Sequence, residues 1–67
     1  MPRTVRELAK DLTNAGYVLV AGGGKGSHRK YAHPRPGVPF VILAGKLGGD
    51  AKPYQEKDVR DAVQAVQ

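Results

Sequence analysis

A chain of 67 residues without cysteine is large enough for one small domain, which we expect to span residues 1–67. A domain of this size buries only about 60% of the surface that its unfolded chain exposes, so a deep substrate cavity is not expected. The lack of cysteine excludes disulfides and thiolate metal sites. No apolar run approaches the roughly 18 residues of a membrane span, and the charged start indicates a soluble, unexported protein of the cytoplasm.

Positive charge is concentrated in the middle of the chain. Eleven Lys and Arg against six Asp and Glu give a formal net charge of +5. The segment Lys25–Lys52 carries six of the cations and a single acid, Asp50. Such an excess favours a polyanionic partner such as RNA, although a basic surface that serves only solubility is an alternative.

Two amphipathic helices are predicted near the ends of the chain. Thr4 followed three residues later by Glu7 fits a capping box, and apolar residues recur at helical spacing over Val5–Ala15. Gly16 stands where a left-handed residue would end this helix. A second helix should begin at residues 52–53 and bury an apolar stripe, which consists of Val59, Ala62, Val63 and Val66.

Three β-strands are predicted between the helices, at residues 17–21, 27–32 and 40–44. A glycine-rich turn at 22–26 and a proline-containing loop at 33–37 separate them. Connections this short favour an antiparallel meander, and the only large apolar partner for both helices is one face of that sheet. The predicted fold is therefore α+β, in the order α-β-β-β-α, with both helices on one face and the other face open to solvent or ligand.

The stretch Lys25–Tyr31 has one imidazole, that of His28, among three cations. RNA is cleaved without a metal when its own 2′-hydroxyl attacks the adjacent phosphorus, which requires a base and an acid. A histidine, with an ordinary pKa near ~6.5, supplies either, and neighbouring cations stabilise the charge that gathers on the phosphate. His28 is therefore the candidate catalytic residue, and a histidine that merely packs or is solvated at a strand end is the alternative.

Alternation along an extended strand assigns these side chains to faces. His28 and Lys30 point one way, and Ser27, Arg29 and Tyr31 point the other way. If Tyr31 is a core aromatic, His28 and Lys30 face outward, and Lys30 is the first choice for a phosphate contact. Arg29 lies on the Tyr31 side, from which it either reaches round the sheet edge to RNA or is a solvated or helix-paired charge.

The glycine-rich turn is a second candidate for phosphate binding. Successive backbone N–H groups in such a turn form an anion-binding nest, with Lys25 beside it, or the turn is simply a flexible hairpin connection. It lacks the spacing of a nucleotide-binding P-loop, which excludes an NTPase of that class. The candidate RNA-binding residues are Lys25, Gly26, Ser27, Arg29 and Lys30.

Other chemistry has little support in the sequence. His33 is a second candidate acid or base, but a histidine before proline is commonly just part of a loop. Ser27 has no orienting acid nearby that would make it a nucleophile. Asp50 is the only acid between Asp11 and Glu56, so neither a dedicated metal site nor a cofactor is expected.

The motif Gly26–His28 opens the second strand and is followed by Tyr31 and by His33–Pro34. With this motif, and with its predicted topology, size and charge, the chain resembles the HicA family of toxin–antitoxin mRNA interferases over nearly its whole length. A weaker match is Asp50–Tyr54, which leads into the last helix. The three consecutive glycines Gly22–Gly24 depart from the family pattern and leave the conformation of that turn open.

The resemblance implies a fold like that of double-stranded-RNA-binding domains and an endoribonuclease activity on mRNA. It also implies that the motif histidine, here His28, is needed for cleavage, and that a HicB-type antitoxin covers the site in a hetero-oligomer. A non-catalytic RNA-binding module of the same fold is the main alternative. A third possibility is a small structural subunit whose basic patch docks on an acidic protein surface.

Overall fold

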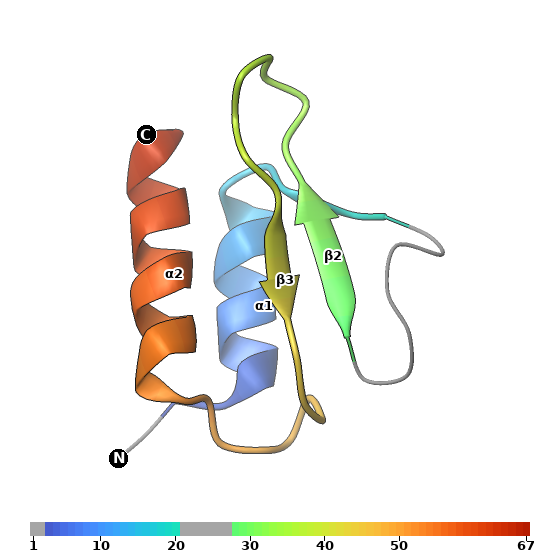
Figure 1. The fold of residues 1–67 in the computed structure, drawn as a ribbon, viewed down its shortest axis with the longest axis vertical. Helices are drawn as coiled ribbons and strands as arrows, with labels where there is room; N and C mark the ends of the chain where they lie inside the picture. The colour runs from blue at the N-terminus through green and yellow to red at the C-terminus, as the bar shows by residue number, and fades with distance from the viewer. Residues whose placement is uncertain (1–2, 21–27) are drawn as a thin grey trace.

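The computed structural model describes residues 3–20 and 28–67, which form two helices and a three-stranded antiparallel sheet (Figure 1). In chain order the elements are α1 (Val5–Asn14), β1 (Val18–Leu19), β2 (Arg29–Ala32), β3 (Val41–Leu43) and α2 (Pro53–Ala65). The predicted α+β fold and its element order are confirmed. Each strand lies within its predicted range but is shorter.

The capping box predicted for α1 is present. The Glu7 N–H donates to Thr4 Oγ1 at 3.2 Å, and the Thr4 N–H donates to Glu7 Oε1 at 2.8 Å. The first-turn N–H of Val5 also donates to the carbonyl of Gly49 at 3.0 Å. Because side chain and loop together satisfy N–H groups that a helix start leaves unpaired, α1 begins where the sequence predicts.

The end of α1 depends on Gly16. Its φ of 101° lies in the left-handed region that glycine adopts without strain. A Cβ at this position would also lie 2.9 Å from Nε2 of His33, whose ring packs over the turn. Glycine is thus required here both for its backbone conformation and for its lack of a side chain.

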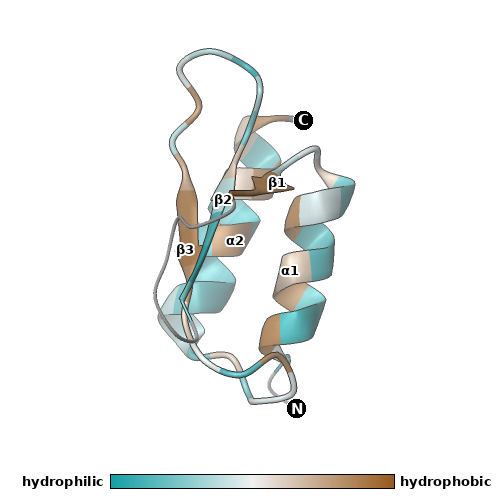
Figure 2. Cartoon of the chain, turned by 90° about the vertical axis from the view of Figure 1, so that its right-hand side faces the viewer, coloured by the Kyte–Doolittle hydropathy of each residue, from teal (hydrophilic) through white to brown (hydrophobic). Residues whose placement is uncertain are grey.

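Strand β2 is the centre of the sheet and pairs antiparallel with both neighbours. Lys30 is registered with Ile42 of β3, and Ala32 is registered with Val18 of β1. Figure 2 shows the hydrophilic β2 between the two hydrophobic strands β1 and β3. The sheet therefore places its most polar strand between two strands of apolar side chains.

Both helices contribute to one core, on the covered face of the sheet. Figure 1 shows α1 behind the sheet and α2 alongside the β3 edge. Tyr17 joins the two layers, because its hydroxyl donates to the carbonyl of Ala62 in α2 at 3.0 Å. The buried apolar residues are Val5, Leu8, Ala9, Leu12, Tyr17, Tyr31, Leu43, Ala51 and Val59.

Helix α2 has the predicted amphipathic pattern. Val59 is buried, and the other members of the predicted stripe are partly buried against the core. On the solvent side Lys57 Nζ lies 2.9 Å from Asp61 Oδ2, one helical turn away. Within the part of the chain that the structure describes, no helix is both long enough and apolar enough to cross a membrane.

The capping box makes the stability of the fold depend on pH. The hydrogen bond from the Thr4 backbone lowers the pKa of the Glu7 carboxyl. Because the folded pKa is below the unfolded one, the stabilisation is present above the unfolded pKa and is lost as pH falls through the folded pKa. Urea unfolding should show Glu7→Gln less stable than wild type near neutral pH, and the difference should vanish in acid.

Thr4→Ala should cost about 1 kcal/mol in the same assay because it removes the N-cap oxygen. Thr13→Ala is the matched control. Its hydroxyl donates to the Ala9 carbonyl within the same helix and caps no terminus. Equal losses for the two variants would contradict the capping role of Thr4.

Candidate functional site

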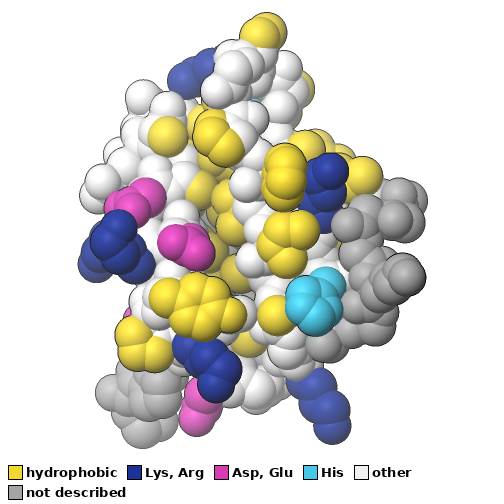
Figure 3. All heavy atoms as spheres, in the orientation of Figure 1, with side chains coloured by type: hydrophobic (Ala, Val, Ile, Leu, Met, Phe, Trp, Pro, Cys, Tyr) yellow, Lys and Arg dark blue, Asp and Glu magenta, His cyan; other side chains and the backbone are white. Residues whose placement is uncertain are grey.

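The sheet has one covered face and one open face, as the alternation in β2 predicts. Tyr31 is 5% exposed and Leu43 is 0% exposed, so both lie in the core. Lys30 and its registered partner Ile42 lie on the opposite face. We call this side of the sheet the open face. In Figure 3 it shows hydrophobic side chains beside a histidine and a cation.

His28 lies at the entry to β2 and is exposed. Arg29 of β2 is registered with Leu43 of β3. His28 immediately precedes Arg29, and Ala44 immediately follows Leu43. His28 and Ala44 both line a groove between the sheet and α2. The sequence prediction that this imidazole is accessible is therefore consistent with its position, and its catalytic role stays a prediction.

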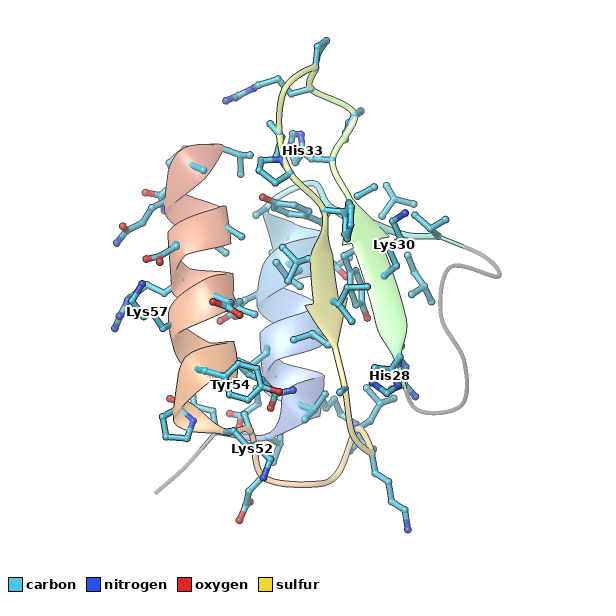
Figure 4. The ribbon with its side chains drawn as sticks, in the orientation of Figure 1. His28, Lys30, His33, Lys52, Tyr54 and Lys57 are labelled. Atoms are coloured by element: carbon cyan, nitrogen blue, oxygen red, sulfur yellow. The ribbon has the colours of Figure 1, made fainter. Side chains whose placement is uncertain are left out.

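Lys30 is half-buried and lies over an aromatic ring. Its Nζ is 4.3 Å from the ring centroid of Phe40, which is 55% exposed. A cation over a ring face is worth about 0.5–1 kcal/mol at an exposed site. Phe40 thus orients the ammonium group on the open face, and His28 lies just before the start of the same strand (Figure 4).

Arg29 points toward the covered face, as alternation predicts. Its Nη1 donates to the carbonyl of Gly45 at 3.2 Å, and the side chain is half-buried. This bond ties the start of β2 to the segment that follows β3. A contact of Arg29 with RNA stays a prediction.

Three other candidate RNA-binding residues, Lys25, Gly26 and Ser27, lie outside the described residues, as does the glycine-rich turn at 22–26. Their roles stay predictions that rest on the sequence. The site that the structure describes consists of His28, Lys30 and the residues around the groove.

His33 has both ring nitrogens bonded to the backbone. The Arg35 N–H donates to Nδ1 at 3.1 Å, so Nδ1 is unprotonated and Nε2, 3.2 Å from the Ala15 carbonyl, is the donor. The ring also meets Tyr17 edge-on, with centroids 5.0 Å apart. His33 thus fastens the loop between β2 and β3 to the end of α1.

The groove is the feature that the sequence analysis missed. It encloses about 620 Å³ between β3 and α2. His28, Ile42 and Phe40 line it from the sheet side, and its α2 wall includes Tyr54, Asp58 and Asp61. The only sequence signal was that these α2 residues lie off the buried stripe. Which surface they face depends on how α2 packs beside β3, and that is a long-range property.

Gln55 fixes this packing. It is 4% exposed, and its Nε2 donates to the Ala44 carbonyl at 2.9 Å. Its Oε1 accepts the Lys52 N–H, also at 2.9 Å, which caps the start of α2. One buried amide thereby joins the end of β3 to the first turn of α2. As a result, Tyr54 and His28 lie at the same level on either side of β3 (Figure 4).

The two carboxylates of the groove differ in their surroundings. The hydrogen bond from Lys57 lowers the pKa of the Asp61 carboxyl. Asp58 has no hydrogen bond or ion pair with any residue in the ranges 3–20 and 28–67. Among those same residues no three His, Asp or Glu side chains come together as a metal-binding group would require.

The fold and the open face define a small α+β protein whose central strand carries two cations, Arg29 and Lys30. The family of HicA toxins of bacterial toxin–antitoxin systems matches residues 5–65. The chain therefore belongs to the HicA toxin family, which confirms the resemblance seen in the sequence. No curated protein and no solved structure matches the chain.

The buried amide of Gln55 provides a test of how the groove is built. Gln55→Ala should destabilise the protein by roughly 1–3 kcal/mol, because it leaves the Ala44 carbonyl and the Lys52 N–H without their partner. Gln64→Ala, on the exposed side of the same helix, is the control and should change stability little. Urea unfolding followed by circular dichroism measures both. A Gln55→Ala protein as stable as wild type would contradict the role given to this residue.

Proposed function

We propose that this protein is the toxin of a toxin–antitoxin pair and acts in the cytoplasm as a metal-independent endoribonuclease on mRNA. The observation that carries the proposal is the exposed His28 on the open face of a HicA family member. Lys30 lies two residues further along the same face. An accessible imidazole with an ammonium group on the same face of the sheet suits cleavage by the RNA 2′-hydroxyl.

In the proposed reaction the 2′-oxygen bonds to phosphorus, and the bond from phosphorus to the 5′-oxygen breaks. The 2′-hydroxyl gives up its proton, and the departing 5′-oxygen takes one. His28 performs one of these transfers as general acid or base, and solvent water at this exposed site performs the other. A positioned proton transfer contributes about 10²- to 10⁴-fold in rate. The Lys30 ammonium stabilises the charge that builds up on the phosphate oxygens.

The partner in this proposal is a HicB-type antitoxin that covers the open face in a hetero-oligomer. Apolar side chains on that face support it. Val18 is 61% exposed, and Phe40 and Ile42 lie beside the Lys30 side chain. Exposed apolar side chains gathered near a charged site are typical of protein interaction surfaces. A protein bound there would cover His28 as well.

The alternative function is a non-catalytic RNA-binding module of the double-stranded-RNA-binding type. In that case Lys30 contacts phosphate, and His28 contacts a sugar or a phosphate without cleavage. The two functions predict similar binding. They differ in whether purified RNA is cut.

The decisive experiment compares wild type with His28→Ala. Induction of wild type should arrest growth, and the purified protein should cut RNA in the presence of EDTA, leaving 2′,3′-cyclic phosphate ends. His28→Ala should lose both activities while its circular dichroism spectrum is unchanged, because the side chain is exposed. As a substrate control, RNA with a 2′-deoxynucleotide at the cut site should resist cleavage. Cutting by His28→Ala at the wild-type rate would assign the chemistry to another residue.

Lys30 should contribute through the phosphate. Lys30→Ala should reduce RNA affinity and make the slope of log K against log salt shallower by about 0.7, the value for one phosphate contact on a single strand. Lys10→Ala, which removes the same charge from the exposed side of α1, is the control and should leave the slope near that of wild type. Identical slopes for the two variants would exclude a specific contact by Lys30.

A further inference from the structure

The groove between β3 and α2 has two chemically different walls. The sheet wall is largely apolar, with Ile42 and Phe40, whereas the helix wall combines the ring of Tyr54 with the carboxylates of Asp58 and Asp61. Its volume of about 620 Å³ lies within the usual range for a small-ligand site. A groove of this composition suits a flat, mostly apolar group that has hydrogen-bond donors on one edge.

The charges around the groove determine how an RNA strand would lie. Asp58 and Asp61 on the α2 wall repel a phosphate, whereas Lys30 on β2 attracts it. The phosphodiester of a bound strand therefore lies over β2, close to His28. A base attached to that backbone reaches across β3 into the groove, where the carboxylates face its edge.

We propose that the groove binds a guanine base of the RNA next to the phosphodiester at His28. The inference rests on the proposed function to the extent that RNA must lie over the open face. Guanine presents two adjacent donors, N1–H and the N2 amino group, that one carboxylate accepts together. Adenine and cytosine present one amino donor beside an acceptor nitrogen, and the N3–H of uracil lies between two acceptor oxygens. A carboxylate therefore selects guanine among the four bases.

Asp58 is the carboxylate that accepts these donors. Asp61 is paired with Lys57 at 2.9 Å, whereas Asp58 has no such partner in the described part of the chain. Both line the groove. Asp58 is also the nearer of the two along the helix to Tyr54, since it lies one turn after that residue.

Tyr54 provides the stacking surface. Its side chain is 57% exposed at the first turn of α2, and it lies across β3 from His28 (Figure 4). The Gln55 amide, bonded to the Ala44 carbonyl at 2.9 Å, holds this turn against the sheet. A ring in this position stacks on a base without distinguishing among bases, so Tyr54 contributes affinity and Asp58 contributes selectivity.

The test measures RNA binding in a His28→Ala background, so that it does not depend on cleavage. Short uridine-rich RNA oligonucleotides carry a single guanosine, inosine, adenosine or cytidine, and binding is followed by fluorescence anisotropy. The guanosine oligonucleotide should bind roughly fivefold or more tightly than those with adenosine or cytidine. Inosine, which lacks the N2 amino group, should bind with intermediate affinity.

Matched variants assign the effect to the groove. Asp58→Asn should abolish the preference for guanosine, whereas Glu56→Gln, the same charge change on the same helix outside the groove, should retain it. Tyr54→Ala should weaken binding of all oligonucleotides roughly tenfold. Tyr54→Phe, which keeps the ring, should bind like the parent protein.

The outcomes separate this inference from the proposed nuclease activity. A guanosine preference that Asp58→Asn removes supports the groove as a base site even if wild type cuts no RNA. Equal binding of all four oligonucleotides, or no binding at all, overturns it even if wild type cuts RNA through His28. If Asp58→Asn instead weakens binding of the purified antitoxin and leaves base preference unchanged, the groove is a protein contact and the inference is wrong.

Discussion

The burial of Tyr31 determines where the other side chains of β2 lie. Because strand side chains alternate, a tyrosine in the core places its neighbour Lys30 on the opposite face, and His28 follows at the same spacing. A slip of one residue would exchange the faces and bury a lysine without a partner, which costs several kcal/mol. Leu43, buried opposite Arg29 on β3, reinforces the same register. Core packing thus places Lys30 and His28 on the open face.

Charge is divided across the open face in a way that the composition alone does not reveal. Lys30 on β2 and the carboxylates of Asp58 and Asp61 on α2 lie on opposite sides of β3. The net charge of +5 predicts attraction of a polyanion, and this division predicts its orientation. In the proposed complex the RNA backbone lies toward β2 and the bases lie toward α2. In that complex, long-range attraction and local selection would arise from different elements of the fold.

The features that local patterns encode could be predicted from the sequence, and those that depend on packing could not. The capping box at Thr4, the left-handed Gly16 and the outward direction of Lys30 each follow from a few neighbouring residues. In the sequence, Gln55 cannot be told from an ordinary exposed helix residue. It is buried because α2 lies against the end of β3. The groove was missed for the same reason, since only that packing brings Tyr54 opposite the sheet.

The two histidines of the chain have different environments, and the difference bears on which of them a ligand can reach. His33 donates to one backbone carbonyl and accepts from one backbone N–H. Both of its ring nitrogens are therefore engaged with backbone groups. Together with the edge-on contact to Tyr17, these bonds fasten the β2–β3 loop to the end of α1. His28 is instead exposed and lines the groove, where a strand bound to the open face would reach it.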